Sequence, residues 1–175
     1  MKKVLIIIIL LSLLILEGIA MILLPTNIFI SDMYIIPHWV FLFILLVNVF
    51  FDNEELYFSI TLAIVFGLLI DVVYTDLLGV YMFVYPLAIY IVNLIKQFFQ
   101  ANFYITVVYY LVSFTIIEMM IYIIYSFVDL INITYILFIW DRLIPTIIAN
   151  FIFLLVLYPI FSKRLVKWKL KESKD

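Results

Sequence analysis

The chain has 175 residues, of which 69% are hydrophobic and 13% charged, with a formal net charge of −2. A soluble globular domain is about 45–50% apolar and about 25% charged, so this composition, with a mean hydropathy of +1.34, indicates an integral membrane protein. A water-soluble enzyme, a nucleic-acid-binding protein and a disordered chain are excluded. With no cysteine, one histidine and three glycines, the sequence lacks the usual metal ligands and phosphate-binding glycine loops, and we expect no cofactor or metal.

Six apolar segments approach the length needed to cross about 30 Å of hydrocarbon. In chain order they are Val4–Leu24, Ile35–Phe51, Leu56–Val73, Val80–Ile95, Phe103–Val128 and Leu143–Phe161. The stretch Tyr135–Trp140 is too short to span alone, and it either extends the last helix or lies in the membrane interface. The segments predict an all-α, polytopic membrane helix bundle over residues 1–161, followed by a basic cytoplasmic tail over residues 162–175. The lysines of this tail either face anionic lipid or only set the topology.

The basic residues set the predicted orientation. With six spans and a cytoplasmic N-terminus, nine of the ten basic residues lie inside: Lys2, Lys3, Lys96, Lys163, Arg164, Lys167, Lys169, Lys171 and Lys174. Arg142 is the tenth and lies on the outer side. We therefore predict a multi-pass protein of the cell membrane with both termini in the cytoplasm. Because the first apolar run continues through Leu24, we expect an uncleaved anchor rather than a signal peptide.

Charged residues inside a span are costly, so each needs a reason. The predicted spans and their ends carry Glu17, Asp71, Glu118, Asp141 and Arg142. At about 1.5 Å of rise per residue, all of them fall in the outer half of the membrane in this topology. We predict a polar cluster there, joined by Asn150 on the face of Arg142. In it Arg142 pairs with one or two carboxylates, and at least one other carboxylate is protonated or hydrated.

Small residues predict where helices pack closely. Ser59, Ala63 and Gly67 recur every four residues and lead to Asp71 on one helix face. The polar cluster itself has two interpretations, a structural contact between helices or a substrate or ion site. We expect His38, which follows a proline at the start of the second span, to be a solvated interfacial residue.

Two stretches carry a family resemblance. They are Gly67-Leu-Leu-Ile-Asp71, followed by Tyr-Thr-Asp-Leu-Leu-Gly79, and Asp141-Arg142-Leu-Ile-Pro145-Thr146-Ile-Ile-Ala-Asn150, seen together with Glu17, Pro37 and Glu118. Over nearly its whole length the chain resembles the MreD family of rod shape-determining proteins of low-GC Gram-positive bacteria. The matched positions add Gly79 and Pro145 to the residues expected at helix contacts. His38 departs from the family pattern, in which a charged residue often follows this proline.

The resemblance implies a non-catalytic subunit of the cell-elongation and peptidoglycan synthesis machinery. Such proteins accompany MreC and, through it, MreB, RodA and a class B penicillin-binding protein. The resemblance also implies a fold similar to the substrate-binding components of energy-coupling-factor transporters. We therefore expect a membrane scaffold for a single-span MreC-like protein; the alternative is a small-molecule-binding or transport component that uses the polar cluster. A third possibility, an intramembrane enzyme, ranks last because this sequence has no paired-Asp or Ser–His arrangement at matching depth with a clear activating partner.

Overall fold

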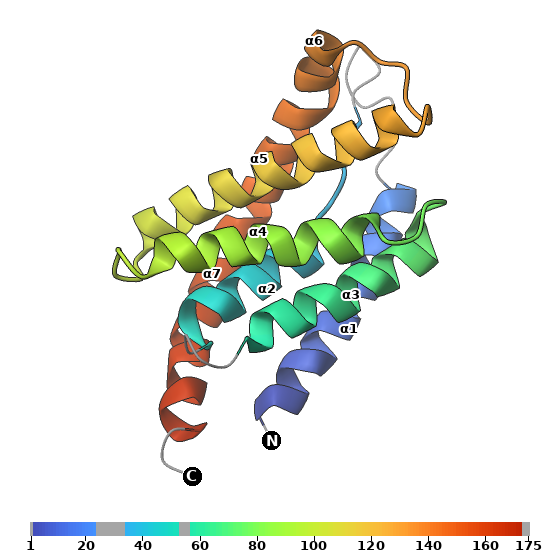
Figure 1. Cartoon of the computed structure of the whole chain (residues 1–175). Helices are drawn as coiled ribbons and strands as arrows, with labels where there is room; N and C mark the ends of the chain where they lie inside the picture. The colour runs from blue at the N-terminus through green and yellow to red at the C-terminus, as the bar shows by residue number, and fades with distance from the viewer. Residues whose placement is uncertain (1, 24–33, 53–56, 173–175) are drawn as a thin grey trace.

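The computed structural model describes residues 2–23, 34–52 and 57–172, and these ranges hold helices and no strand. The helices are α1 (Lys2–Leu23), α2 (Trp39–Phe50), α3 (Phe58–Tyr74), α4 (Val80–Lys96), α5 (Phe103–Phe127), α6 (Tyr135–Phe138), the π-helical turn η1 (Ile139–Leu143) and α7 (Ile144–Glu172). The last three form one continuous helix, so the described chain has six helices. Figure 1 shows the start of α1 and the end of α7 at the same end of the bundle.

Three of the six helices are long and apolar enough to cross a membrane: α1, α5 and the continuous helix Tyr135–Lys171. The other three, α2, α3 and α4, are also apolar but have 12, 17 and 17 residues. The predicted fold class, an all-α polytopic membrane helix bundle, is confirmed. The predicted bounds of the fourth and fifth spans lie within one residue of α4 and α5.

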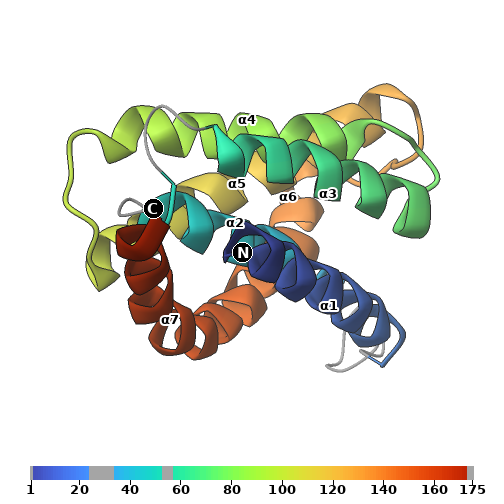
Figure 2. The ribbon, with the colours of Figure 1, turned by 90° about the horizontal axis from the view of Figure 1, so that it is seen from below.

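Helix α2 is the centre of the bundle. Its sequence is apolar on every side except at Asn48, and a helix that is apolar all round must be enclosed by other helices. All of its residues from Val40 to Phe50 are buried, and it contacts α1, α3, α4, α5 and α7, as Figures 1 and 2 show. Twelve residues rise only about 18 Å, so α2 is a core helix that the other helices surround.

The predicted second span differs from the structure at its start. Residues 34–38 are extended, and the helix begins only at Trp39. Apolar composition indicated a segment inside the membrane, but it did not distinguish a helix from an extended chain. Extended backbone is tolerated at membrane depth only where protein groups satisfy its hydrogen bonds, and α7 provides them here.

The last helix begins earlier than predicted, because Tyr135–Phe138 and the π-helical turn continue directly into α7. Of the two alternatives for Tyr135–Trp140, the structure therefore gives the extension of the last helix. Pro145 lies just after the π turn and has no N–H to donate to the carbonyl of Asp141. That carbonyl instead accepts the backbone N–H of Tyr34 at 2.8 Å. At its other end the helix continues through most of the predicted tail, with Leu165 buried.

Helices α3 and α4 lie side by side in both views (Figures 1 and 2) and approach closely at Gly67. A Cβ atom added to Gly67 would lie 2.5 Å from the carbonyl oxygen of Tyr81, so a side chain here would push the two backbones apart. Ala63, one turn earlier, is also fully buried. Gly79 starts α4 with a φ of +97°, a left-handed conformation that strains other residues.

Candidate functional site

The extended segment 34–38 lies along α7, and two polar side chains one turn apart on α7 hold it. The Asn150 amide donates to the carbonyl of Ile36 and accepts the N–H of His38, both at 2.8 Å. The Thr146 hydroxyl accepts the N–H of Ile36 at 3.3 Å and donates to the carbonyl of Tyr34 at 3.4 Å. These contacts satisfy the backbone groups that a helix would otherwise have paired. Asn150, which the sequence assigned to the polar cluster, thus fixes the entry to α2.

A chain of hydrogen bonds then joins four helices at the start of α2. Arg142 Nε donates to Glu118 Oε2 at 2.9 Å, and Glu118 Oε1 lies 2.7 Å from His38 Nε2. The other ring nitrogen of His38 lies 2.9 Å from the Tyr85 hydroxyl. Since a carboxylate only accepts hydrogen bonds, we assign the proton to Nε2 of His38 and the donor role on the other side to Tyr85. Glu118 therefore connects α5 to η1 and α2, and α4 joins through Tyr85.

His38 is fully buried, so the prediction of a solvated interfacial histidine is wrong. Besides its two hydrogen bonds, the imidazole is surrounded by the rings of Tyr81, Tyr85 and Phe114 at centroid distances of 5.6–6.1 Å. Its partner Glu118 lies 80 residues away in the chain, which no local pattern reveals. The available signal was the apolar context: the residues on both sides of Pro37-His38 are ones that favour the protein interior.

Glu17 reaches the same place from α1. Its Oε2 accepts the backbone N–H of Val40 at 2.9 Å, in the first turn of α2. An acidic group at a helix N-terminus satisfies a free N–H and interacts favourably with the helix dipole. The structure thus brings Glu17, Glu118, Arg142 and Asn150 together around residues 36–40.

Asp71 binds the N-terminus of α4, as Glu17 binds the N-terminus of α2. Its two oxygens accept the backbone N–H groups of Gly79, Tyr81 and Met82 at 2.9–3.0 Å, which are free N–H groups at the start of α4. Asp71 therefore binds the start of α4 and does not pair with Arg142. The group formed by Glu118, Arg142, His38 and Tyr85 is called the Glu118 cluster below. The carboxylate of Asp141 makes no hydrogen bond or ion pair with a residue in the described ranges; it lines a separate hollow with Tyr34 and Phe138.

A second polar cluster lies at the other end of α2, where the sequence predicted no site. Asn48 donates to the Ser59 hydroxyl at 2.8 Å and to the side-chain oxygen of Asn93 at 2.7 Å. Asp52 Oδ2 accepts from the backbone N–H and the hydroxyl of Ser59 at the start of α3. Lys96 donates to the carbonyl of Asn48 at 2.7 Å. Ser59, predicted as a small packing residue, is fully buried and also forms hydrogen bonds.

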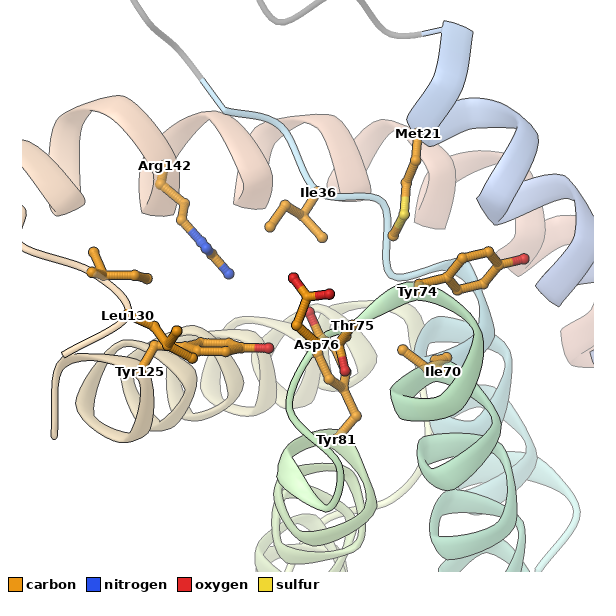
Figure 3. A pocket seen from close by; sticks show the side chains of 11 residues that line it. Met21, Ile36, Ile70, Tyr74, Thr75, Asp76, Tyr81, Tyr125, Leu130 and Arg142 are labelled. Carbon is orange, nitrogen blue, oxygen red and sulfur yellow. The ribbon is translucent and has the colours of Figure 1, made fainter. Parts of the chain in front are cut away.

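A cavity of about 360 Å³ lies next to Arg142, at the N-terminal end of α2 (Figure 3). Residues from several helices and loops line it, among them Arg142, Asp76, Thr75, Tyr81 and Tyr125. Of the residues predicted for a binding site, only Arg142 lines this cavity, because Asp71 and Glu118 are bound to other groups. Figure 3 shows the guanidinium of Arg142 and the carboxylate of Asp76 directed into the same space.

The described residues offer no grouping of three or more His, Cys, Asp or Glu side chains that could hold a metal ion. Their four buried carboxylates, Glu17, Asp52, Asp71 and Glu118, each accept hydrogen bonds from another segment of the chain. The chemistry of the two clusters is therefore that of connections between helices.

Comparisons with known proteins identify the family of this chain. The family model for rod shape-determining protein MreD matches residues 1–167. The rod shape-determining protein MreD of Bacillus subtilis (strain 168) is 26% identical over 145 residues, which cover 83% of this chain and 82% of the relative. No solved structure matches the chain, so the similarity to energy-coupling-factor components stays a prediction. By the family match over nearly its whole length, the chain belongs to the MreD family and is a membrane protein involved in rod shape determination.

Proposed function

We propose that this MreD-family protein is a non-catalytic, multi-pass subunit of the cell-elongation machinery in the cell membrane, and that it is a scaffold for a single-span MreC-like protein. Through that protein it would act with MreB, RodA and a class B penicillin-binding protein in oriented peptidoglycan synthesis. The observation that carries the non-catalytic part is the use of the buried carboxylates. Each of the four in the described ranges is bound to another segment, whereas a catalytic acid or base must reach a substrate.

The proposed topology places both termini in the cytoplasm. The two ends of the described chain lie at the same end of the bundle (Figure 1), which an even number of spans requires. Lys2 lies over the ring of Trp168 at 5.9 Å, so basic residues of α1 and α7 are neighbours at that end. A concentration of Lys and Arg at one end is typical of the cytoplasmic side.

Scaffolding predicts a stable complex in the membrane. The experiment is co-purification of the full-length chain from membranes with a tagged MreC-like protein of the same organism, in mild detergent. An unrelated single-span protein with the same tag is the control. We expect retention with the MreC-like protein and not with the control. Equal retention with both, or with neither when both are expressed, contradicts the proposal.

Photo-crosslinking in intact cells can identify the surface on which the MreC-like protein packs. Ile8 on α1, Val65 on α3 and Ile152 on α7 are exposed apolar residues on different helices. A crosslinker placed at each position in turn should reach the MreC-like protein from one face of the bundle and not from the others, because helix association in lipid depends on close, specific packing. Equal crosslinking from all three positions would indicate collisions and no defined interface.

A second candidate function is the binding of a small molecule. The cavity beside Arg142 favours it, because a concave site with apolar walls and a few convergent polar groups is typical of ligand binding. Its test is thermal stabilisation of the purified protein by candidate ligands, since a ligand that binds only the folded state raises the melting temperature. No shift with any vitamin, phospholipid or lipid-linked precursor would count against this function.

A further inference from the structure

Two opposite charges face each other across the cavity of about 360 Å³ without forming an ion pair. Arg142 comes from η1 and Asp76 from the loop between α3 and α4, and both line the space. Figure 3 shows the two side chains directed toward its centre. No contact within 4 Å joins them, although Arg142 is paired with Glu118. An opposite pair held apart around an open volume is the arrangement that a ligand with two charges would complete.

Both side chains have hydrogen-bonding capacity left. Arg142 uses Nε for Glu118, and its two terminal nitrogens have no partner among the described residues. Its side chain is 16% exposed, so the guanidinium is mostly shielded from solvent by the protein. A partly shielded guanidinium suits a phosphate or a carboxylate, which it can bind with two parallel hydrogen bonds. The carboxylate of Asp76 likewise has no partner in the described chain and is suited to accept from an ammonium group.

The rest of the wall is amphipathic. Met21, Ile36, Ile70 and Ile131 supply apolar surface, and Tyr125 supplies a ring with a hydroxyl that faces the space. A ligand that fits this cavity would have apolar groups next to its charged groups. The wall residues come from α1, α3 and α5, from the segment that precedes α2 and from the loop that follows α5. The bound molecule would therefore contact most of the bundle.

We propose that this cavity binds the head of a zwitterionic amphiphile, with its phosphate or carboxylate against Arg142 and its primary ammonium against Asp76. This inference rests on the second candidate function and is independent of the scaffold role. A simple anion would face the carboxylate of Asp76, and a simple cation would face Arg142. Like charges that share one cavity repel each other, and the repulsion is stronger where the protein shields them from water. A zwitterion satisfies both groups at once.

Such a head can belong to a membrane lipid or to a free solute, and the experiment separates these two sources. The full-length purified protein is incubated with phosphatidylethanolamine, phosphatidylglycerol or phosphatidylcholine of identical acyl chains, and retained lipid is measured by native mass spectrometry. Soluble glycerophosphoethanolamine is tested in parallel by thermal shift. We expect phosphatidylethanolamine to be retained on the order of tenfold better than the other two lipids, because only its ammonium can donate a charge-assisted hydrogen bond to Asp76.

The variant that tests the site is Asp76→Asn. Asp76 is exposed and makes no bond to the described chain, so the variant should fold, and an unchanged melting temperature without ligand will verify this. Its preference for phosphatidylethanolamine should disappear. Asp141→Asn is the matched control, since Asp141 is another acid of this region that does not line the cavity. It should keep the preference.

Five outcomes are informative. Loss of the preference in Asp76→Asn alone supports the proposal, and a shift with glycerophosphoethanolamine in the wild type assigns the ligand to free solutes as well. Equal retention of phosphatidylglycerol and phosphatidylethanolamine overturns it in favour of an anion site at Arg142. A preference that survives Asp76→Asn also overturns it but leaves the second candidate function standing. No retention and no shift with any of these probes overturns the proposal, and no shift with vitamins or lipid-linked precursors as well overturns the second candidate function.

Discussion

The two ends of α2 are both polar, but they are built from different groups. At the N-terminal end, charged side chains from three other parts of the chain meet: Glu17 from α1, Glu118 from α5 and Arg142 from η1. At the C-terminal end, the contacts are mainly those of amides and a hydroxyl with one carboxylate: Asn48 and Asp52 bind Ser59 on α3, and Asn48 also binds Asn93 and Lys96 on α4. The first end joins distant helices through a buried ion pair, and the second joins α2 to α3 and α4 through hydrogen bonds without an ion pair between described side chains.

This difference predicts unequal sensitivity to mutation. At the N-terminal end, one substitution can remove the ion-pair partner of a fully buried carboxylate, which is costly; at the C-terminal end, Asp52 keeps the backbone N–H of Ser59 when a neighbouring side chain is removed. Variants at the N-terminal end should therefore destabilise the bundle more than variants at the C-terminal end, although both ends contact the same helix.

The largest effect is expected for Arg142→Ala. It leaves the fully buried Glu118 with only His38 as a partner, and breaking a buried pair from one side costs about 3–5 kcal/mol. Reversible unfolding in mixed micelles measures the change. Asp141→Ala is the control at the neighbouring position, and its effect should be within about 0.5 kcal/mol. Similar losses for the two variants would show that the π turn, and not the ion pair, sets stability here.

An intermediate effect is expected for Asp71→Ala. Asp71 is a buried charge that accepts from three backbone N–H groups at the start of α4 and, at 3.5 Å, from the Thr75 hydroxyl. Removing it leaves three donors unsatisfied but no unpaired charge, so we expect a loss of about 2–3 kcal/mol. Hydrogen exchange should locate the loss in the first turn of α4. Faster exchange throughout α2 instead would mean that Asp71 belongs energetically to the Glu118 cluster.

The comparison also separates what the sequence predicts from what it does not. The charges at the N-terminal end were identified because charge inside an apolar span is conspicuous. His38 was missed because its partner is remote, and the extended segment 34–38 was missed because its hydrogen bonds come from Thr146 and Asn150, more than 100 residues away. Helix bounds were predicted well where polar turns end the helix, as at α4 and α5.

The C-terminal end was missed for a different reason. Asp52 lies in an acidic turn, and such a turn predicts a solvated loop; its bonds to Ser59 depend on how α3 folds back beside α2. The continuity of the last helix was one of the two alternatives that the sequence left open. The structure decides between them, because the π turn accommodates Asp141 and Arg142, and Pro145 frees the carbonyl that accepts the N–H of Tyr34.

The smallest effect is expected for Ser59→Ala. It removes the hydroxyl that accepts from Asn48 and donates to Asp52. Because Asp52 keeps the backbone N–H of Ser59, we expect a loss of about 1.5 kcal/mol. Thermal melting of the purified protein measures it. Ser12→Ala, at an exposed position on α1, should change the melting temperature less. A loss as large as that of Arg142→Ala would remove the distinction between the two ends.

The start of α2 depends most on Glu118, which joins it to η1 through an ion pair with Arg142. A double-mutant cycle with Glu118→Gln and Arg142→Gln, followed by unfolding in mixed micelles, measures that coupling directly. We predict that the double variant is more stable than the sum of the single losses implies, by at least about 1 kcal/mol. Losses that add within about 0.5 kcal/mol would contradict the account.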